Sequence, residues 1–206
     1  MRRRRGAAAT ALATAVATAL AALLAVLAGC TSASGSSAPA ARSTGDVGTV
    51  RTVLHPCPAQ SADAARGGTT LPKLRLRCVG GGSLDLAKAP GVPMVVNLWG
   101  SWCGPCRDEL PIMQQFADAA GERVRVVGVI SKDGVPQAES FAEDAKVTFP
   151  SAFDGQGDLM AEEGLNALPV SYLVDAAGAV TYTQVGPVAS LDDLRRLVAE
   201  HLGVQL

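Results

Sequence analysis

A Cys-x-x-Cys motif stands where the sequence changes from a strand pattern to a helix pattern. Residues 93–99 (PMVVNLW) form an apolar run of strand length with two adjacent valines, which is typical of a buried strand. The motif follows directly, and the apolar residues that then recur at helical spacing are Cys106, Leu110, Met113 and Ala117. Both cysteines are therefore predicted to lie between a buried strand and the first turn of a helix.

The remaining chain alternates between strand and helix patterns. Gly121 is predicted to end the helix that follows the motif, and Pro111 should kink it. Further strands are predicted over residues 123–130, 149–153, 169–174 and 179–185, and helices over 136–146, 158–164 and 191–202, with the 136–146 helix at the surface. Residues 73–79 and 83–86 are predicted to form an earlier hairpin around three glycines. This order predicts an α/β fold with a central mixed sheet flanked by helices.

The helix position of the two cysteines favours thiol chemistry. The N-terminus of a helix stabilises a thiolate through unpaired N–H groups and the helix dipole, so Cys103 is the expected nucleophile. Such a thiolate attacks a disulfide to give a mixed disulfide. Cys106 lies one turn later and can resolve that intermediate, while Pro105 suits a first helical turn. We expect Cys103 to be exposed and Cys106 to be largely buried.

Metal binding is the alternative interpretation of the motif. A structural zinc site needs four ligands, but the chain has no second Cys-x-x-Cys and its only histidines are His55 and His201. Haem attachment requires a histidine after the second cysteine, and Arg107 occupies that position. The sequence therefore predicts no metal site and no cofactor.

The first 30 residues have the pattern of a secretory signal. Four arginines (residues 2–5) precede an uncharged stretch over residues 7–28, and the segment Leu27 to Cys30 (LAGC) ends it. That segment resembles a bacterial lipobox, whose cysteine is lipidated after cleavage. An uncleaved transmembrane anchor is the alternative, and both interpretations place the rest of the chain outside the cytoplasm. We expect a protein held by lipid on the extracytoplasmic face of the cell membrane.

A linker and one domain are predicted after the signal. Residues 31–48 are rich in Ser, Ala and Gly and are expected to form a flexible tether, with the domain over 49–206 and an N-terminal extension over 49–90. Of the 18 basic residues four are the N-terminal arginines, which leaves 14 against 19 acidic residues. A mildly acidic domain offers no basic patch for nucleic acid.

The cysteine count supports a second disulfide. The chain has five cysteines, and lipidation of Cys30 would leave four. With Cys103 and Cys106 paired, Cys57 and Cys78 remain and can persist as a structural disulfide in an exported protein. Closing that loop of about 20 residues would stabilise the fold by roughly 3 kcal/mol. The alternative is two unpaired buried thiols.

The sequence around the motif resembles a known family. Residues 99–107 (WGSWCGPCR) and 109–111 (ELP) are similar to thioredoxin-fold proteins of the TlpA/ResA type, and the resemblance covers roughly residues 70–203. It implies a thioredoxin-like fold and a membrane-anchored, extracytoplasmic thiol–disulfide oxidoreductase. Residues 132–150 resemble an insertion typical of the family. Several members reduce apocytochrome c, whereas actinobacterial relatives oxidise exported proteins.

Further site residues come from this resemblance. Leu168 and Pro169 match the family's cis-proline loop, which faces the motif and pairs its backbone with substrate, although Pro169 could simply begin a strand. With Trp102 they form the expected substrate-binding set. Glu109 matches a carboxylate that tunes thiol acidity or relays protons, and the alternative is a favourable dipole interaction early in the helix. Asn97 departs from thioredoxin, which has a buried Asp there, so Glu109 is the candidate proton acceptor for Cys106.

Three functions are compatible with these features. The first is a reductant of exported proteins, including apocytochrome c, supplied by a membrane electron-transfer partner. The second is an oxidase that installs disulfides. The Gly-Pro dipeptide between the cysteines is identical to that of thioredoxin, but this identity alone does not fix the redox potential. The third is a copper metallochaperone, since thiolates select Cu(I), although neither histidine is well placed for it. A cell-surface binding lipoprotein would leave the motif without a role.

Overall fold

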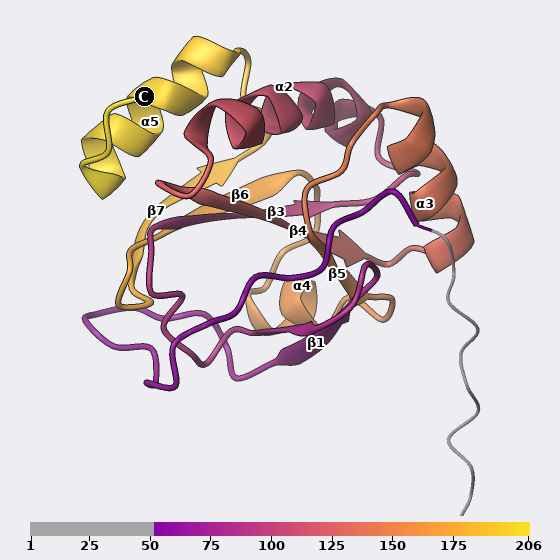
Figure 1. The fold of residues 1–206 in the computed structure, drawn as a ribbon. Coiled ribbons are helices and arrows are strands. Elements are labelled where there is room, and N and C mark those ends of the chain that lie inside the picture. Colours follow the sequence, from indigo (N-terminus) through magenta and orange to yellow (C-terminus); the bar gives the residue numbers. More distant parts are fainter. Residues whose placement is uncertain (1–51) are drawn as a thin grey trace, which may run out of the picture. The chain divides into compact units, whose positions relative to one another are not determined.

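The computed structural model describes residues 52–206 (Figure 1). The predicted signal segment, the lipidation site Cys30 and the linker over residues 31–48 lie outside the described residues. Within the described part, no helix combines the length and the apolar character needed to cross a bilayer.

A single seven-stranded mixed sheet forms the centre of the fold. The strands are β1 (Arg75–Cys78), β2 (Ser83–Asp85), β3 (Met94–Trp99), β4 (Arg125–Ser131), β5 (Ser151–Asp154), β6 (Val170–Val174) and β7 (Val180–Val185). Their order across the sheet is β2-β1-β5-β4-β3-β6-β7. The strands β3, β4 and β5 are parallel, and antiparallel hairpins complete both edges. The predicted central mixed sheet is confirmed.

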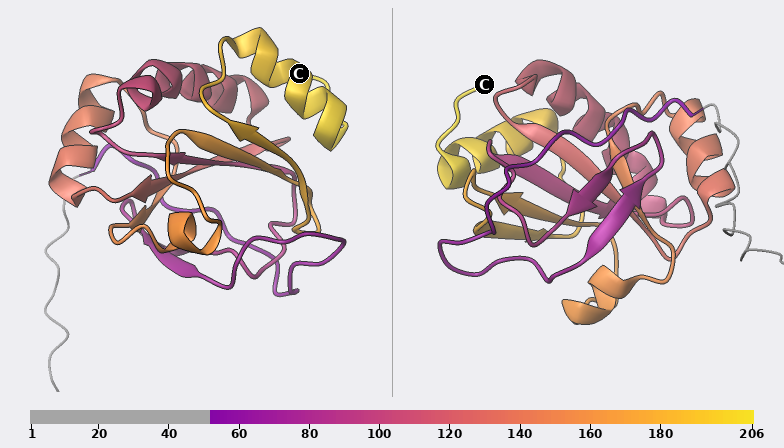
Figure 2. Two further views of the ribbon diagram at one scale, coloured as in Figure 1. Left: turned by 180° about the vertical axis from the view of Figure 1, so that it is seen from behind. Right: turned by 60° about the horizontal axis from the view of Figure 1, so that its bottom comes forward.

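Helices cover both faces of this sheet (Figure 2). They are α2 (Gly104–Ala120), α3 (Val135–Asp144), α4 (Asp158–Glu162) and α5 (Leu191–Leu202). The helices α2, α3 and α5 pack against one face, and α4 packs against the other with β1 and β2 nearby. The thioredoxin-like fold class predicted from the sequence is confirmed.

The strand β3 passes through the centre of both apolar layers. All six of its residues are buried. Val95 and Trp99 belong to the layer under α2, α3 and α5, whereas Val96 and Leu98 belong to the layer on the α4 side. Burial on both faces explains why this segment is an almost continuous apolar run in the sequence.

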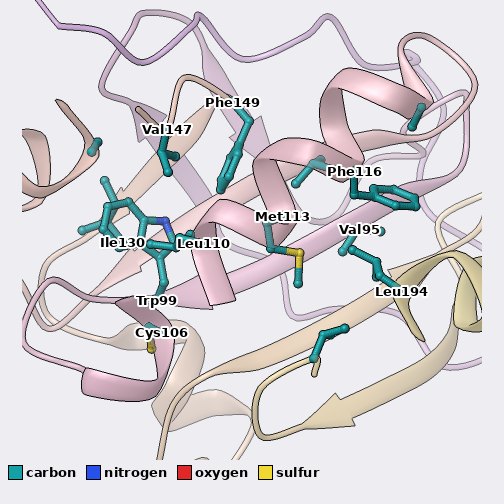
Figure 3. Close-up of a cluster of buried hydrophobic side chains, with 14 of the residues drawn as sticks. Val95, Trp99, Cys106, Leu110, Met113, Phe116, Ile130, Val147, Phe149 and Leu194 are labelled. Atoms are coloured by element: carbon teal, nitrogen blue, oxygen red, sulfur yellow. The ribbon is translucent and has the colours of Figure 1, made fainter. Parts of the chain in front are cut away.

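The helix α2 begins and ends where its sequence predicts. Cys103 is the N-cap residue, with Pro105 in the first turn, and Gly121 follows the last turn with φ of 55°, which favours glycine. Leu110 and Met113 are fully buried against the sheet (Figure 3). The stripe also includes the fully buried Phe116, and Ala117 is half-buried and packs against the same cluster.

The helix α3 differs from the prediction of a surface element. Its Ala138, Phe141 and Ala142 are buried in the same layer as α2. The sequence does not reveal this contact, because the apolar face of α3 is narrow and its partners are distant in the chain. The segment that resembles a family insertion thus packs beside the start of α2, where the guanidinium of Arg107 lies 4.7 Å from the Phe141 ring centroid.

Candidate active site

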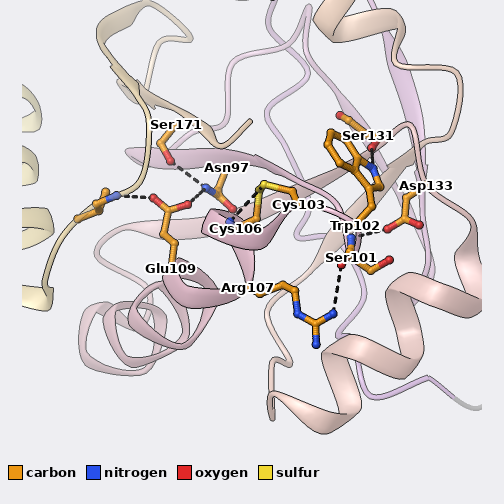
Figure 4. Close-up of a disulfide and its surroundings, with 11 residues drawn as sticks. Asn97, Ser101, Trp102, Cys103, Cys106, Arg107, Glu109, Ser131, Asp133 and Ser171 are labelled. Atoms are coloured by element: carbon orange, nitrogen blue, oxygen red, sulfur yellow. Dashed lines mark hydrogen bonds between the residues drawn. A yellow bond between two sulfur atoms is a disulfide. The ribbon is translucent and has the colours of Figure 1, made fainter. Parts of the chain in front are cut away.

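The two cysteines of the motif form a disulfide at the start of α2 (Figure 4). Their sulfur atoms are 2.03 Å apart and their Cα atoms 5.3 Å apart. Cys103 Sγ also accepts a hydrogen bond of 3.2 Å from the backbone N–H of Cys106. The unpaired N–H groups of the first turn therefore lie where a negative charge on Cys103 would be stabilised.

The prediction that Cys103 is exposed is wrong for this disulfide form. Cys103 is only 4% exposed and Cys106 is fully buried. Cys103 is bonded to its buried mate, and both belong to the apolar cluster under α2. The neighbouring Trp102 projects outward instead and is 55% exposed.

The loop before the cysteines is held by the end of β4. The carboxylate of Asp133 accepts a hydrogen bond of 2.6 Å from the Ser101 N–H, and Trp102 Nε1 donates to the Ser131 carbonyl at 3.3 Å. From the other side, Arg107 donates to the Ser101 carbonyl at 3.4 Å. These contacts fix the backbone that carries Trp102 and Cys103 (Figure 4).

Glu109 lies one turn after Cys106 in α2, and its side chain is buried. Its Oε2 accepts a hydrogen bond of 2.9 Å from Asn97 Nδ2, and its Oε1 accepts one of 2.7 Å from the Val188 N–H. Burial raises the pKa of the Glu109 carboxyl above its ordinary value of 4.5, and the two hydrogen bonds oppose that rise. A carboxyl in this environment can hold or release a proton closer to neutral pH than an exposed one.

The loop before β6 contains the predicted cis peptide bond. The Leu168–Pro169 bond is cis, and the Pro169 carbonyl accepts a hydrogen bond of 3.0 Å from the Gly186 N–H. Pro169 is buried, and Leu168 packs partly buried against the cluster that includes Cys103 and Cys106. The loop and the disulfide therefore share one apolar cluster, although they are far apart in the chain.

A second disulfide joins the segment around Cys57 to strand β1. Cys57 and Cys78 are bonded, with Cα atoms 5.9 Å apart, so that the segment around Cys57 is held against the end of β1. Gly80 is packed so closely against the backbone of Leu54 and His55 that a side chain would collide with it. Across residues 52–206, no group of three or more His, Cys, Asp or Glu side chains is arranged to hold a metal ion.

Sequence reasoning did not find Asp133, Ser171 or the Val188 N–H as parts of the site. Ser171 Oγ accepts a hydrogen bond of 3.0 Å from Asn97 Nδ2, because β6 pairs with β3 and sets the two residues opposite each other. The place of Asp133 just after a buried strand was an available signal, since side chains at the carboxyl ends of parallel strands gather at one edge. Val188 contributes only its backbone, so its residue type carries no signal.

Comparison with known proteins identifies relatives of the same chemistry. The Redoxin family profile matches residues 65–198, which is more than half of the chain. Sporulation thiol-disulfide oxidoreductase A of Bacillus subtilis is 35% identical over 104 residues, which cover 48% of this chain and 63% of that protein. The chain thus aligns with less than two thirds of that relative.

Two further relatives align over a larger part of their own length. Thiol-disulfide oxidoreductase ResA of Geobacillus thermodenitrificans is 29% identical over 126 residues, covering 61% of this chain and 72% of that protein. The solved structure of a secreted Mycobacterium tuberculosis disulfide oxidoreductase, described as homologous to E. coli DsbE, is 26% identical with a TM-score of 0.55. It covers 62% of this chain and 96% of the solved chain.

Proposed function

We propose that this chain, a thiol–disulfide oxidoreductase that belongs to the Redoxin family, exchanges disulfides with exported proteins through Cys103 and Cys106. The observation that carries the proposal is the position of the pair: a bonded Cys-x-x-Cys in the first turn of α2, with Cys103 as the N-cap residue. This position provides both a stabilised thiolate and a resolving thiol within bonding reach.

The reaction starts from the dithiol form. The Cys103 thiolate attacks one sulfur of the substrate disulfide, a new S–S bond joins Cys103 to the substrate, and the other substrate sulfur leaves as a thiolate that takes up a proton. The Cys106 thiol then loses its proton and attacks Cys103 Sγ, which releases the second substrate thiolate. The substrate gains two electrons, and the Cys103–Cys106 disulfide shown in Figure 4 is the oxidised product.

Glu109 is the proposed acceptor for the Cys106 proton. The carboxyl lies three residues after Cys106 on the same face of α2, and burial raises its pKa. A base with a raised pKa remains able to take a proton at neutral pH and to return it. The contacts to Asn97 and Val188 hold the carboxyl in place during that exchange.

The substrate is proposed to bind over Trp102 and the cis-proline loop. Trp102 offers an exposed apolar surface directly before Cys103. Leu168 is partly exposed beside the same cluster, and Pro169 is the first residue of the segment that leads into β6. An extended substrate chain lying between these residues would place its disulfide near Cys103.

The proposed location is the extracytoplasmic face of a bacterial membrane, with Cys30 as the lipidated residue. Support comes from the sequence of residues 1–30, which has the order of a signal peptide with a lipobox, and from a related structure that is described as secreted. Residues 31–48 would link the lipid to the domain over residues 49–206.

The proposed direction is reduction of exported proteins, with apocytochrome c as one candidate substrate. The Gly-Pro dipeptide between the cysteines, which is also that of thioredoxin, supports this direction. An exported reductant needs electrons from a membrane partner. Oxidation of exported thiols is the alternative, and the potential of the Cys103–Cys106 couple distinguishes the two. A value near that of thioredoxin, about −270 mV, supports a reductant, whereas one near −120 mV supports an oxidase.

Insulin reduction tests the proposal. With dithiothreitol as electron source, the full chain should reduce insulin disulfides faster than dithiothreitol alone does, and the Cys103→Ser protein should give no such acceleration. The Cys57→Ser/Cys78→Ser protein is the matched control, because it also removes one disulfide but leaves the motif intact. An acceleration that survives Cys103→Ser would overturn the proposed mechanism.

A further inference from the structure

An oxygen atom in the middle of the site has no partner. Asn97 is fully buried, and its Nδ2 donates to both Glu109 Oε2 and Ser171 Oγ. Its Oδ1 is buried without any hydrogen bond among residues 52–206. An unpaired buried acceptor carries a free-energy cost, so its persistence beside a reactive group calls for a physical reason.

The chemistry of the neighbours fixes which way the amide points. Asn97 Nδ2 faces Glu109 Oε2 and donates to it, so the oxygen on the other branch of the amide points away from that carboxyl. Cys106 and Glu109 are three residues apart on α2 and both are buried against the sheet. Figure 4 shows the Asn97 side chain between Glu109 and the disulfide, with its oxygen on the Cys106 side.

We propose that Asn97 Oδ1 accepts the hydrogen bond of the Cys106 thiol in the reduced protein. The inference rests on the proposed function, because it assigns a role within the same dithiol–disulfide cycle. A partner dithiol supplies two electrons and two protons and becomes a disulfide, and the Cys103–Cys106 bond breaks. Cys106 Sγ takes up one proton, Cys103 Sγ is left as the thiolate, and the second proton goes to solvent. That S–H is a new donor, and Oδ1 is a buried acceptor without a partner on the Cys106 side of the amide.

This contact makes Asn97 the link between the resolving thiol and the buried carboxyl. Through its oxygen the amide contacts the reduced Cys106, and through its nitrogen it holds Glu109 at 2.9 Å. The oxidised protein leaves Oδ1 unpaired and the reduced protein satisfies it. This difference in hydrogen bonding favours the dithiol form, so Asn97 raises the redox potential of the couple.

Equilibration with glutathione measures this effect. In the full chain, Asn97→Leu removes the acceptor with little change of volume, and the equilibrium should shift about fivefold toward the disulfide, or about 20 mV. Ser151→Ala is the control, since it removes a buried hydroxyl on β5 and should leave the potential unchanged. If the equilibrium constant of Asn97→Leu with glutathione lies within twofold of the wild-type value, or is shifted toward the dithiol, the inference is overturned.

Infrared spectroscopy of the S–H bond tests the contact without changing Asn97. The difference between the Cys103→Ser and the Cys103→Ser/Cys106→Ser spectra isolates the Cys106 S–H stretch. The band should lie at lower frequency than that of an alkanethiol in an apolar solvent, because the thiol donates a hydrogen bond. A band at the alkanethiol position would contradict the contact even if the leucine variant failed to fold.

The outcomes separate this inference from the proposed function. If the wild-type chain shows no Cys103-dependent insulin reduction, the proposed function fails, whatever the S–H band shows. If insulin reduction depends on Cys103 but the band and the equilibrium contradict the contact, only the role of Asn97 fails.

Discussion

Glu109 Oε1 accepts a hydrogen bond of 2.7 Å from the backbone N–H of Val188, which joins the middle of α2 to the segment before α5. The two residues are 79 positions apart in the chain. A buried carboxyl is thereby connected to two elements of the fold and, through Asn97, to a third. Changes in its protonation should consequently affect both the stability of the fold and the thiol chemistry.

The stability of the protein should depend on the protonation of Glu109. Burial raises the folded-state pKa of this carboxyl above 4.5, so the folded protein binds the proton more tightly than the unfolded chain does. Relative to Glu109→Gln, the wild type should have an added stability that is complete below about pH 4.5 and is lost as pH rises through the folded pKa. Urea unfolding of both proteins across pH measures the difference. A difference that grows with rising pH would contradict the assigned environment.

The rate of the thiol step should also respond to Glu109. Glu109→Gln removes the proposed acceptor of the Cys106 proton, and the apparent pKa of insulin reduction should rise, because the thiol must then lose its proton directly to solvent. Rates measured across pH for both proteins provide the comparison. Identical profiles would show that the carboxyl has a structural role only.

Trp102 should matter for substrate rather than for folding. Its side chain is 55% exposed and makes one hydrogen bond of 3.3 Å to Ser131, so Trp102→Ala should lower the free energy of unfolding by less than about 1 kcal/mol. The KM for insulin should rise roughly five- to thirtyfold, as expected when an apolar anchor is removed. Val53→Ala, which truncates another exposed apolar side chain, is the control and should leave KM unchanged.

The second disulfide should stabilise the fold without taking part in turnover. The bond between Cys57 and Cys78 closes a loop with a sequence separation of 21, and Cys57→Ser/Cys78→Ser should cost roughly 3 kcal/mol in the free energy of unfolding. Thermal unfolding measures that loss, while insulin reduction at a temperature below the transition should persist. Loss of turnover in a protein that is still folded would instead assign the pair a redox role.

The sequence predicts the elements of this fold well because each has a local signal. The buried strand β3 is an apolar run, α2 ends at Gly121, and the side chain of Ser190 accepts a hydrogen bond from the Asp193 N–H at the start of α5. The pairing of β1 with β5 has no such signal, since it joins strands more than 70 residues apart. Long-range pairing of this kind depends on the whole sheet.

The site residues that belong to a recognisable sequence motif are predictable. The cysteines and the cis-proline loop are recognisable from their immediate neighbours in the sequence. The unpaired oxygen of Asn97 and the contact between Asp133 and Ser101 depend on how β3, β4 and α2 pack together. The burial of Cys103 could not be predicted from its helix position, because it follows from the bond to Cys106 and the surrounding apolar cluster.

Trapping of the mixed disulfide is the most direct test of the assigned roles of the two cysteines. In Cys106→Ser the resolving sulfur is absent, so a protein substrate that carries a disulfide should remain covalently attached through Cys103. Mass spectrometry after non-reducing separation should locate that bond at Cys103, and Cys103→Ser should give no such adduct. Adducts that form equally well with Cys103→Ser, or that map to Cys57 or Cys78, would contradict the account.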